Sequence, residues 1–106
     1  MHIQHDIQNI EVEGKEIPLP VVLYTVPDRF KYKMTEVTFT NLGQTPTRVV
    51  LSDVSGANSV EKLVVNLNAN ETLSLNGFMR HFAKSVVATN LVNDTVVAIS
   101  SSGYLC

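Results

Sequence analysis

The chain has 106 residues, a formal net charge of −2 and only 17% charged residues, whereas soluble domains average about 25%. This length predicts a single domain with one hydrophobic core. The weak negative charge argues against a nucleic-acid partner, which would call for a clear basic excess. Cys106 is the only cysteine, so no disulfide can form within the chain and packing must supply the stability.

Signals for membranes or export are missing from the sequence. No apolar run approaches the roughly 20 residues that a membrane-spanning helix needs. The first residues lack the basic region and the apolar core of a signal peptide. We therefore expect no membrane partner, and a protein that is made and assembled in a cytoplasm.

The composition favours strands and turns over helices. Sixteen valines and nine threonines fit pleated, half-buried surfaces, while nine asparagines favour turns. Helical periodicity is nearly absent, and turn residues divide the chain into short runs. This pattern indicates an all-β sandwich or barrel.

Residues 1–20 are predicted to form an N-terminal arm or edge segment. Apolar residues alternate only loosely from Ile3 to Val12. The run that follows consists of Ile17, Pro18, Leu19 and Pro20. It cannot be a central strand, because proline donates no ladder hydrogen bond and pushes the residue before it to extended geometry. A sandwich domain of residues 21–106 is expected to follow.

The next strand is predicted to contain a bulge. Apolar residues alternate from Phe30 to Met34 and again from Val37 to Phe39, with the phase shifted by one residue between the two runs. Such a slip would turn the side chains to the opposite face of the sheet unless an extra residue is absorbed. We therefore predict a β-bulge near Thr35-Glu36.

The same segment interleaves cations with aromatic rings, from Arg29 to Lys33. In a strand, Arg29, Lys31 and Lys33 share one face, and the two rings share the other. A solvated basic face over two buried rings explains this pattern better than a nucleic-acid groove.

Residues 78–84 are ambiguous. Phe78, Phe82 and Ala83 fit helical spacing, but only over about one turn. We predict a loop or a short helical turn at a corner of the sandwich, after a turn at Asn76-Gly77.

The segments add up to about eight strands, the number in a jelly roll. They are residues 3–12, 21–26, 30–40, 47–53, 63–67, 72–75, 85–90 and 95–105. The expected fold is an antiparallel β-sandwich of jelly-roll type. Its last strand contains no charged residue, so it is either an edge that another element or subunit covers, or a central strand that is already paired.

No catalytic set stands out. His2 and His5 beside Asp6 fall short of a closed zinc site. His81 has no carboxylate or nucleophile near it in sequence, and the serines at 100–102 lack the glycine spacing of a nucleophile elbow. We expect no enzyme activity, no metal and no cofactor.

The order of these pieces resembles a family of small virion proteins found in tailed phages and related viruses. The resemblance rests on Thr25-Val26-Pro27, on the strand of residues 37–41, on the Asn-rich turn and strand of residues 67–75, and on Ser102-Gly103-Tyr104. It covers about residues 22–106. The sequence departs from the family at Asp28-Arg29, where Ala-Gly is usual, and in its bulkier residues 78–82.

This resemblance implies a jelly-roll-like module of a capsid, neck, tail or fibre that acts by assembly. The implied partners are copies of the chain and other virion proteins, and the implied location is the virion, assembled in the host cytoplasm. The predicted assembly contacts are Ile17, Pro18, Leu19 and Pro20 in the arm, with Phe78 and Met79.

A small ligand-binding module is the alternative interpretation, because β-sandwiches often bind sugars or peptides through loops at one end. Phe78 with Asn76 is the candidate pair for such a site.

Overall fold

A computed structural model describes the backbone of residues 3–14, 21–90 and 95–106, and the side chains of residues 21–77, 80–89 and 97–106. Within the described residues it has eight strands and no helix. The strands are β1 (Ile3–Gly14), β2 (Val21–Thr25), β3 (Tyr32–Asn41), β4 (Thr47–Ser55), β5 (Asn58–Leu67), β6 (Thr72–Phe82), β7 (Ser85–Asn90) and β8 (Thr95–Leu105). The predicted all-β fold is confirmed.

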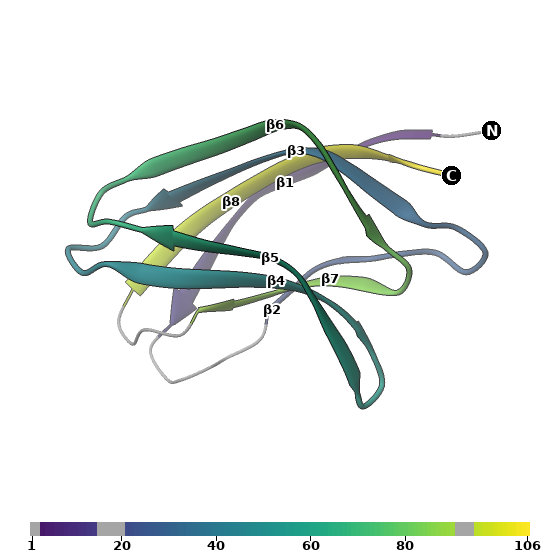
Figure 1. The fold of residues 1–106 in the computed structure, drawn as a ribbon, viewed down its shortest axis with the longest axis horizontal. Coiled ribbons are helices and arrows are strands. Elements are labelled where there is room, and N and C mark those ends of the chain that lie inside the picture. Colours follow the sequence, from purple (N-terminus) through teal and green to yellow (C-terminus); the bar gives the residue numbers. More distant parts are fainter. Residues whose placement is uncertain (1–2, 15–20, 91–94) are drawn as a thin grey trace.

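The strands form two four-stranded antiparallel sheets that stack face to face (Figure 1). One sheet has the order β1-β8-β3-β6 and the other the order β2-β7-β4-β5. This order results from rolling up a long hairpin ribbon in which β1 pairs with β8, β2 with β7, β3 with β6 and β4 with β5. Rolling then brings β3 beside β8 and β4 beside β7. A rolled ribbon of eight strands is a jelly roll, as predicted.

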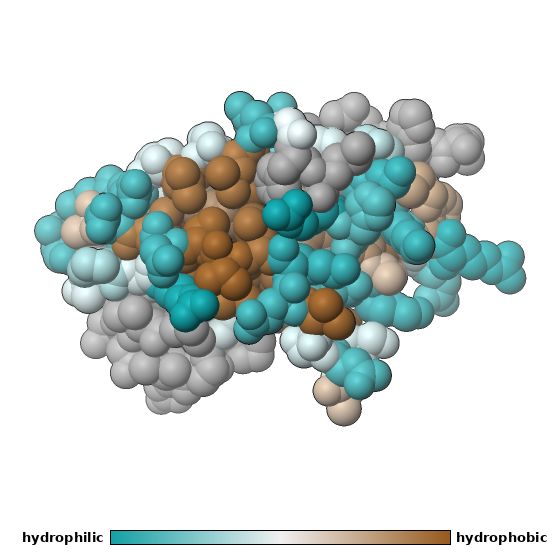
Figure 2. All heavy atoms as spheres, in the orientation of Figure 1, coloured by the Kyte–Doolittle hydropathy of each residue, from teal (hydrophilic) through white to brown (hydrophobic). Residues whose placement is uncertain are grey.

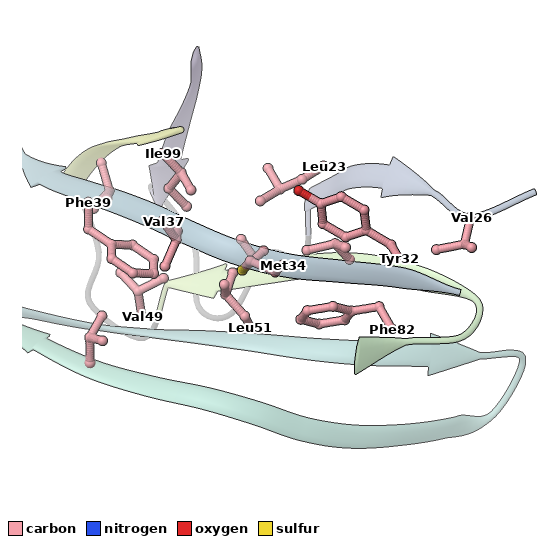
Figure 3. Close-up of a cluster of buried hydrophobic side chains, with 14 of the residues drawn as sticks. Leu23, Val26, Tyr32, Met34, Val37, Phe39, Val49, Leu51, Phe82 and Ile99 are labelled. Carbon is pink, nitrogen blue, oxygen red and sulfur yellow. The ribbon is translucent and has the colours of Figure 1, made fainter. Parts of the chain in front are cut away.

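The core lies between the sheets and follows from strand alternation. In β3, Tyr32, Met34, Val37 and Phe39 are buried, because side chains on one face of a strand recur at every second residue outside the bulge. Figure 3 shows these side chains packed between the layers with residues from other strands, Leu51 among them. Burying a side chain of this size contributes roughly 1.5–3 kcal/mol.

The bulge predicted in β3 is confirmed. The register of β3 against both β6 and β8 shifts between Met34 and Glu36, so Thr35 has no directly opposed residue. The Thr35 hydroxyl donates a hydrogen bond to the Ser102 carbonyl oxygen at 3.2 Å. The bulge thereby restores the alternation that buries Val37.

Strand β6 corrects two predictions. It runs without interruption from Thr72 to Phe82, so the predicted turn at Asn76-Gly77 is wrong, and the loop predicted for residues 78–84 is limited to the connection at residues 83–84. Met34 pairs with Arg80 and Glu36 pairs with Asn76, so β6 advances four residues over a stretch in which β3 advances two. Gly77 has a φ of 74°, which glycine adopts readily, and the Asn-Gly signal therefore marks a bulge. Pairing with β3 on either side of the bulge overrides the weak helical spacing.

The uncharged strand β8 is central, between β1 and β3, so the second interpretation of this strand is correct. Packing around it is tight at Gly103, where a Cβ atom would collide with the Lys33 carbonyl oxygen and the Tyr32 ring. On its other side β1 pairs along β8 and forms the edge of the sheet. The division into an arm of residues 1–20 and a domain of residues 21–106 stays a prediction.

Candidate interaction surface

The two sheets end on the same side of the molecule in β6 and β5 (Figure 1). Among the described strands, β5 pairs with β4 alone and β6 with β3 alone. The two strands are consecutive and run in opposite directions, one in each layer. The sandwich is therefore open between them, and the outer side of each backbone carries no strand ladder.

An apolar strip lies in this opening. Leu63 of β5 and Leu73 and Leu75 of β6 pack against the core but are only partly buried. Figure 2 shows hydrophobic side chains gathered on this face of the molecule, between the positions of β6 and β5 in Figure 1. Val64 of β5, with 37% of its surface accessible, follows Leu63 directly and therefore lies on the outer face of its sheet, outside this strip. Contiguous apolar surface of this kind makes the opening the candidate interaction site.

The outer face of the neighbouring strands is polar by contrast. The hydroxyls of Thr38 and Ser74 are hydrogen bonded at 3.1 Å, and so are those of Thr40 and Thr72. These pairs tie β6 to β3 with short side chains that water can also reach. In this part of the sheet, the accessible apolar side chains lie in the opening, while the side chains on the flat outer face are polar.

The fully buried Asn41 stabilises the end of the opening that lies at the turns after β3 and β5. Its amide nitrogen donates to the carbonyl oxygens of Thr45 at 2.9 Å and Asn68 at 3.0 Å. Its side-chain oxygen accepts from the Gly43 N–H at 2.9 Å. One amide thus joins the turn after β3 to the turn after β5, and holds the two layers together at this end.

At the opposite end of the opening, the side chains of Arg80 and Asp53 make hydrogen bonds to the backbone. The Arg80 Nε of β6 donates to the Lys62 carbonyl oxygen of β5 at 3.0 Å. The Asp53 carboxylate of β4 accepts the N–H groups of Ala83, Lys84 and Ser85 at 2.8, 3.0 and 3.1 Å.

The surroundings of Asp53 change its acidity. Desolvation by itself would raise the pKa of this carboxyl, but the three backbone N–H groups and the charge of Lys62 together hold the pKa below its ordinary value. The carboxylate form therefore links β4 to the connection between β6 and β7.

The predicted assembly residues fall in two places. Ile17, Pro18, Leu19 and Pro20 lie outside the described residues. Phe78 and Met79 belong to the β6 segment that bulges relative to β3, at the open edge of the sheet, and their side chains are likewise outside the description. Sequence reasoning missed Leu63, Leu73 and Leu75 as surface residues, because their alternation predicts burial and does not reveal which strand ends a sheet.

The predicted strand from Phe30 begins only at Tyr32, and Arg29 lies in the preceding turn with a φ of 71°, but both rings of the basic segment face the core. Tyr32 is fully buried, with its hydroxyl 3.2 Å from the Ser101 Oγ, and Phe30 packs partly buried against the core. Lys33 turns outward, and its Nζ lies 5.8 Å from the centre of the Tyr104 ring. These aromatic groups serve packing.

The described side chains offer little for catalysis. Among them no group of three or more His, Cys, Asp or Glu residues could hold a metal ion, and no buried side-chain nitrogen or oxygen lacks a hydrogen-bond partner. His81 and Cys106 are exposed. In the described part of the chain, no helix is long and apolar enough to cross a membrane.

The chain is similar to solved structures in fold. A structure from the Bacillus endospore appendages, a family of disulfide-linked pili, superimposes with a TM-score of 0.62 at 10% sequence identity, over 98% of this chain and 86% of that one. The Drosophila NLP core, whose structure bears on pentamer formation and histone binding, superimposes with a TM-score of 0.50 at 12% identity, over 94% and 98% of the two chains. No protein-family model and no curated protein matches the sequence. At these identities the likeness shows a shared fold.

Proposed function

We propose that the chain is a non-enzymatic structural subunit that associates with copies of itself into an ordered assembly. The observation that carries this proposal is the open side of the sandwich, where Leu63, Leu73 and Leu75 are accessible between two strand edges that no other described strand pairs with. Monomeric β-proteins blunt such edges with charge, proline or short strands. A surface that combines apolar groups with free backbone edges is suited to protein contacts rather than to chemistry.

The structural neighbours support the same proposal at the level of assembly. The appendage proteins form pili, and the NLP core is linked to pentamer formation. Both are built on a fold that this chain shares over nearly its whole length. A jelly roll supplies flat sheets and exposed edges that symmetric assemblies reuse.

The specific assembly we propose is a virion, in which the chain would serve as a structural or decoration protein of a capsid, neck, tail or fibre. The resemblance carried by Thr25-Val26-Pro27 and by Ser102-Gly103-Tyr104 supports this choice. Other virion proteins would then be partners in addition to copies of the chain. The proposed arm contacts Ile17–Pro20, and Phe78 and Met79, belong to this proposal.

A pilus-like extracellular appendage is the second candidate, and the Bacillus structure is the observation that favours it. Those pili are disulfide-linked. This chain has one cysteine, the exposed Cys106, and one cysteine can join copies only in pairs. Whichever assembly it forms, we propose that non-covalent contacts hold it together.

The test is the molar mass of the purified chain, measured by light scattering at two concentrations, with and without a reducing agent. We expect a defined oligomer that forms without ligand and keeps its mass after reduction. A monomer at both concentrations would contradict self-association and would favour the alternative interpretation, a ligand-binding module. Loss of the oligomer on reduction would contradict non-covalent assembly.

A further inference from the structure

The open edge, defined as residues 63–67 of β5 and 72–77 of β6, has an unusual composition for exposed strands. The sequence contains no charged residue from 63 to 70 and none from 72 to 79. Charged side chains, lysine above all, are the common protection of edge strands against pairing with another chain. This protection begins only beyond the open edge, with Glu61 and Lys62 on β5 and Arg80 on β6.

The geometry of the open edge restricts what can cover it. Its two strands belong to different layers, and stacked sheets lie about 10 Å apart. A single peptide strand could therefore pair with only one of them. A partner must offer two antiparallel strands at the same separation, with apolar side chains between them to meet Leu63, Leu73 and Leu75. The open edge of a second copy has this shape.

The charges around the opening permit two copies to meet. Strands β5 and β6 and the turn between them carry two acidic residues, Glu61 and Glu71, and two basic residues, Lys62 and Arg80. The formal net charge of this region is zero when His81 is counted as neutral. Two identical surfaces therefore do not repel one another through net charge.

We propose that the open edge is a two-fold self-association interface, in which β5 and β6 of one copy pair with β6 and β5 of a second copy. This inference rests on the proposed function and names the surface that would carry it. A two-fold axis along the apolar strip places β5 beside the partner's β6 in antiparallel orientation, twice. Each four-stranded sheet then continues into the partner's sheet, and the two apolar strips close over one shared core.

The test uses a variant that blocks both edges without touching the core. Val64→Lys with Ser74→Lys places lysines on the outer faces of β5 and β6, outside the apolar strip, and so gives each edge strand the charge that protects edges from pairing. The matched control is Val22→Lys with Thr25→Lys on β2, where both side chains are also exposed. Far-UV circular dichroism and thermal unfolding establish that both variants are folded.

We expect the blocked variant to have the mass of a monomer where the parent chain is assembled, with its dissociation constant raised about 100-fold or more, because the two-fold symmetry sets a lysine-bearing strand against a lysine-bearing strand twice. The β2 control keeps the parent's mass. A folded blocked variant with the parent's mass would overturn this interface while leaving self-association standing. A parent chain that is itself a monomer would overturn both.

Discussion

The two sides of the sandwich differ in how their strands end. On one side the last strands are β1, whose sequence contains Asp6, Glu11 and Glu13, and β2, which is only five residues long. Charge and short length are both devices that prevent a strand edge from pairing further. On the other side β5 and β6 are ten and eleven residues long and carry uncharged stretches next to accessible leucines.

This difference shows that the fold by itself does not decide which surface makes contacts. Both sides have the same backbone architecture, because the jelly roll leaves one end strand of each sheet on each side. We propose that the side chains make one side resistant to pairing and the other receptive. Substitutions at Gly103, Asn41, Asp53 and Cys106, two of them with a matched variant on the open edge, test how strongly each region is held.

The largest effect is expected where strands are paired on both sides. Gly103→Ala on the central strand β8 adds a methyl group that would meet the Lys33 carbonyl and the Tyr32 ring, so we expect the free energy of unfolding to fall by about 3 kcal/mol or more. Ser74→Thr adds one methyl group at the open edge and should change the free energy of unfolding by less than about 0.5 kcal/mol. Urea unfolding of the two variants checks this; equal losses would show that the open edge is as tightly packed as the interior.

The next effect concerns the turn end of the open edge. Asn41→Ala removes three hydrogen bonds from a buried amide, and we expect a loss of about 2–3 kcal/mol in the free energy of unfolding. The exposed Asn66 of β5 provides the matched control, since Asn66→Ala should cost less than about 0.5 kcal/mol. If both variants unfold at the same urea concentration, Asn41 does not fasten the two turns.

A smaller effect is expected at Asp53, at the other end. Asp53→Asn replaces a carboxylate that accepts three N–H groups, with an expected cost of about 1–2 kcal/mol at neutral pH. Because the pKa of Asp53 is lowered in the folded chain, its contribution is complete above the unfolded pKa and is lost as the pH falls through the folded value. Thermal unfolding between pH 7 and about pH 2 should therefore depend less on pH in the variant. An unchanged pH dependence would contradict this role.

The smallest effect is expected at Cys106. Cys106→Ser changes an exposed side chain beyond the end of β8, so unfolding should shift by less than about 0.5 kcal/mol. The assembled mass under reducing conditions should equal that of the parent chain. A dependence of assembly on this thiol would point to covalent linkage instead.

Much of the fold could be predicted from the sequence because alternation and turn residues are local signals. The slip between Met34 and Val37 predicted the bulge at Thr35, and the burial of Tyr32 followed from its phase. The signal at Asn76-Gly77 was misread, because a glycine with positive φ serves a turn and a bulge equally well. Only the pairing of β6 with β3 distinguishes the two.

The proposed interaction surface could not be predicted in the same way. Leu73 and Leu75 have the alternation of core residues, and their partial exposure depends on β6 being the last strand of its sheet. Strand order is a long-range property that periodicity does not contain. The one local signal was the lack of charge from 63 to 70 and from 72 to 79, which gains meaning once those strands are known to be edges.

Hydrogen–deuterium exchange of the parent chain at a low and a high concentration, with mass measured in parallel, would show whether the open edge carries the assembly. We expect the amides of residues 63–67 and 72–77 to exchange more slowly as the mass rises, while those of β2 exchange at the same rate. A rise in mass without slower exchange in β5 and β6 would show that another surface joins the copies.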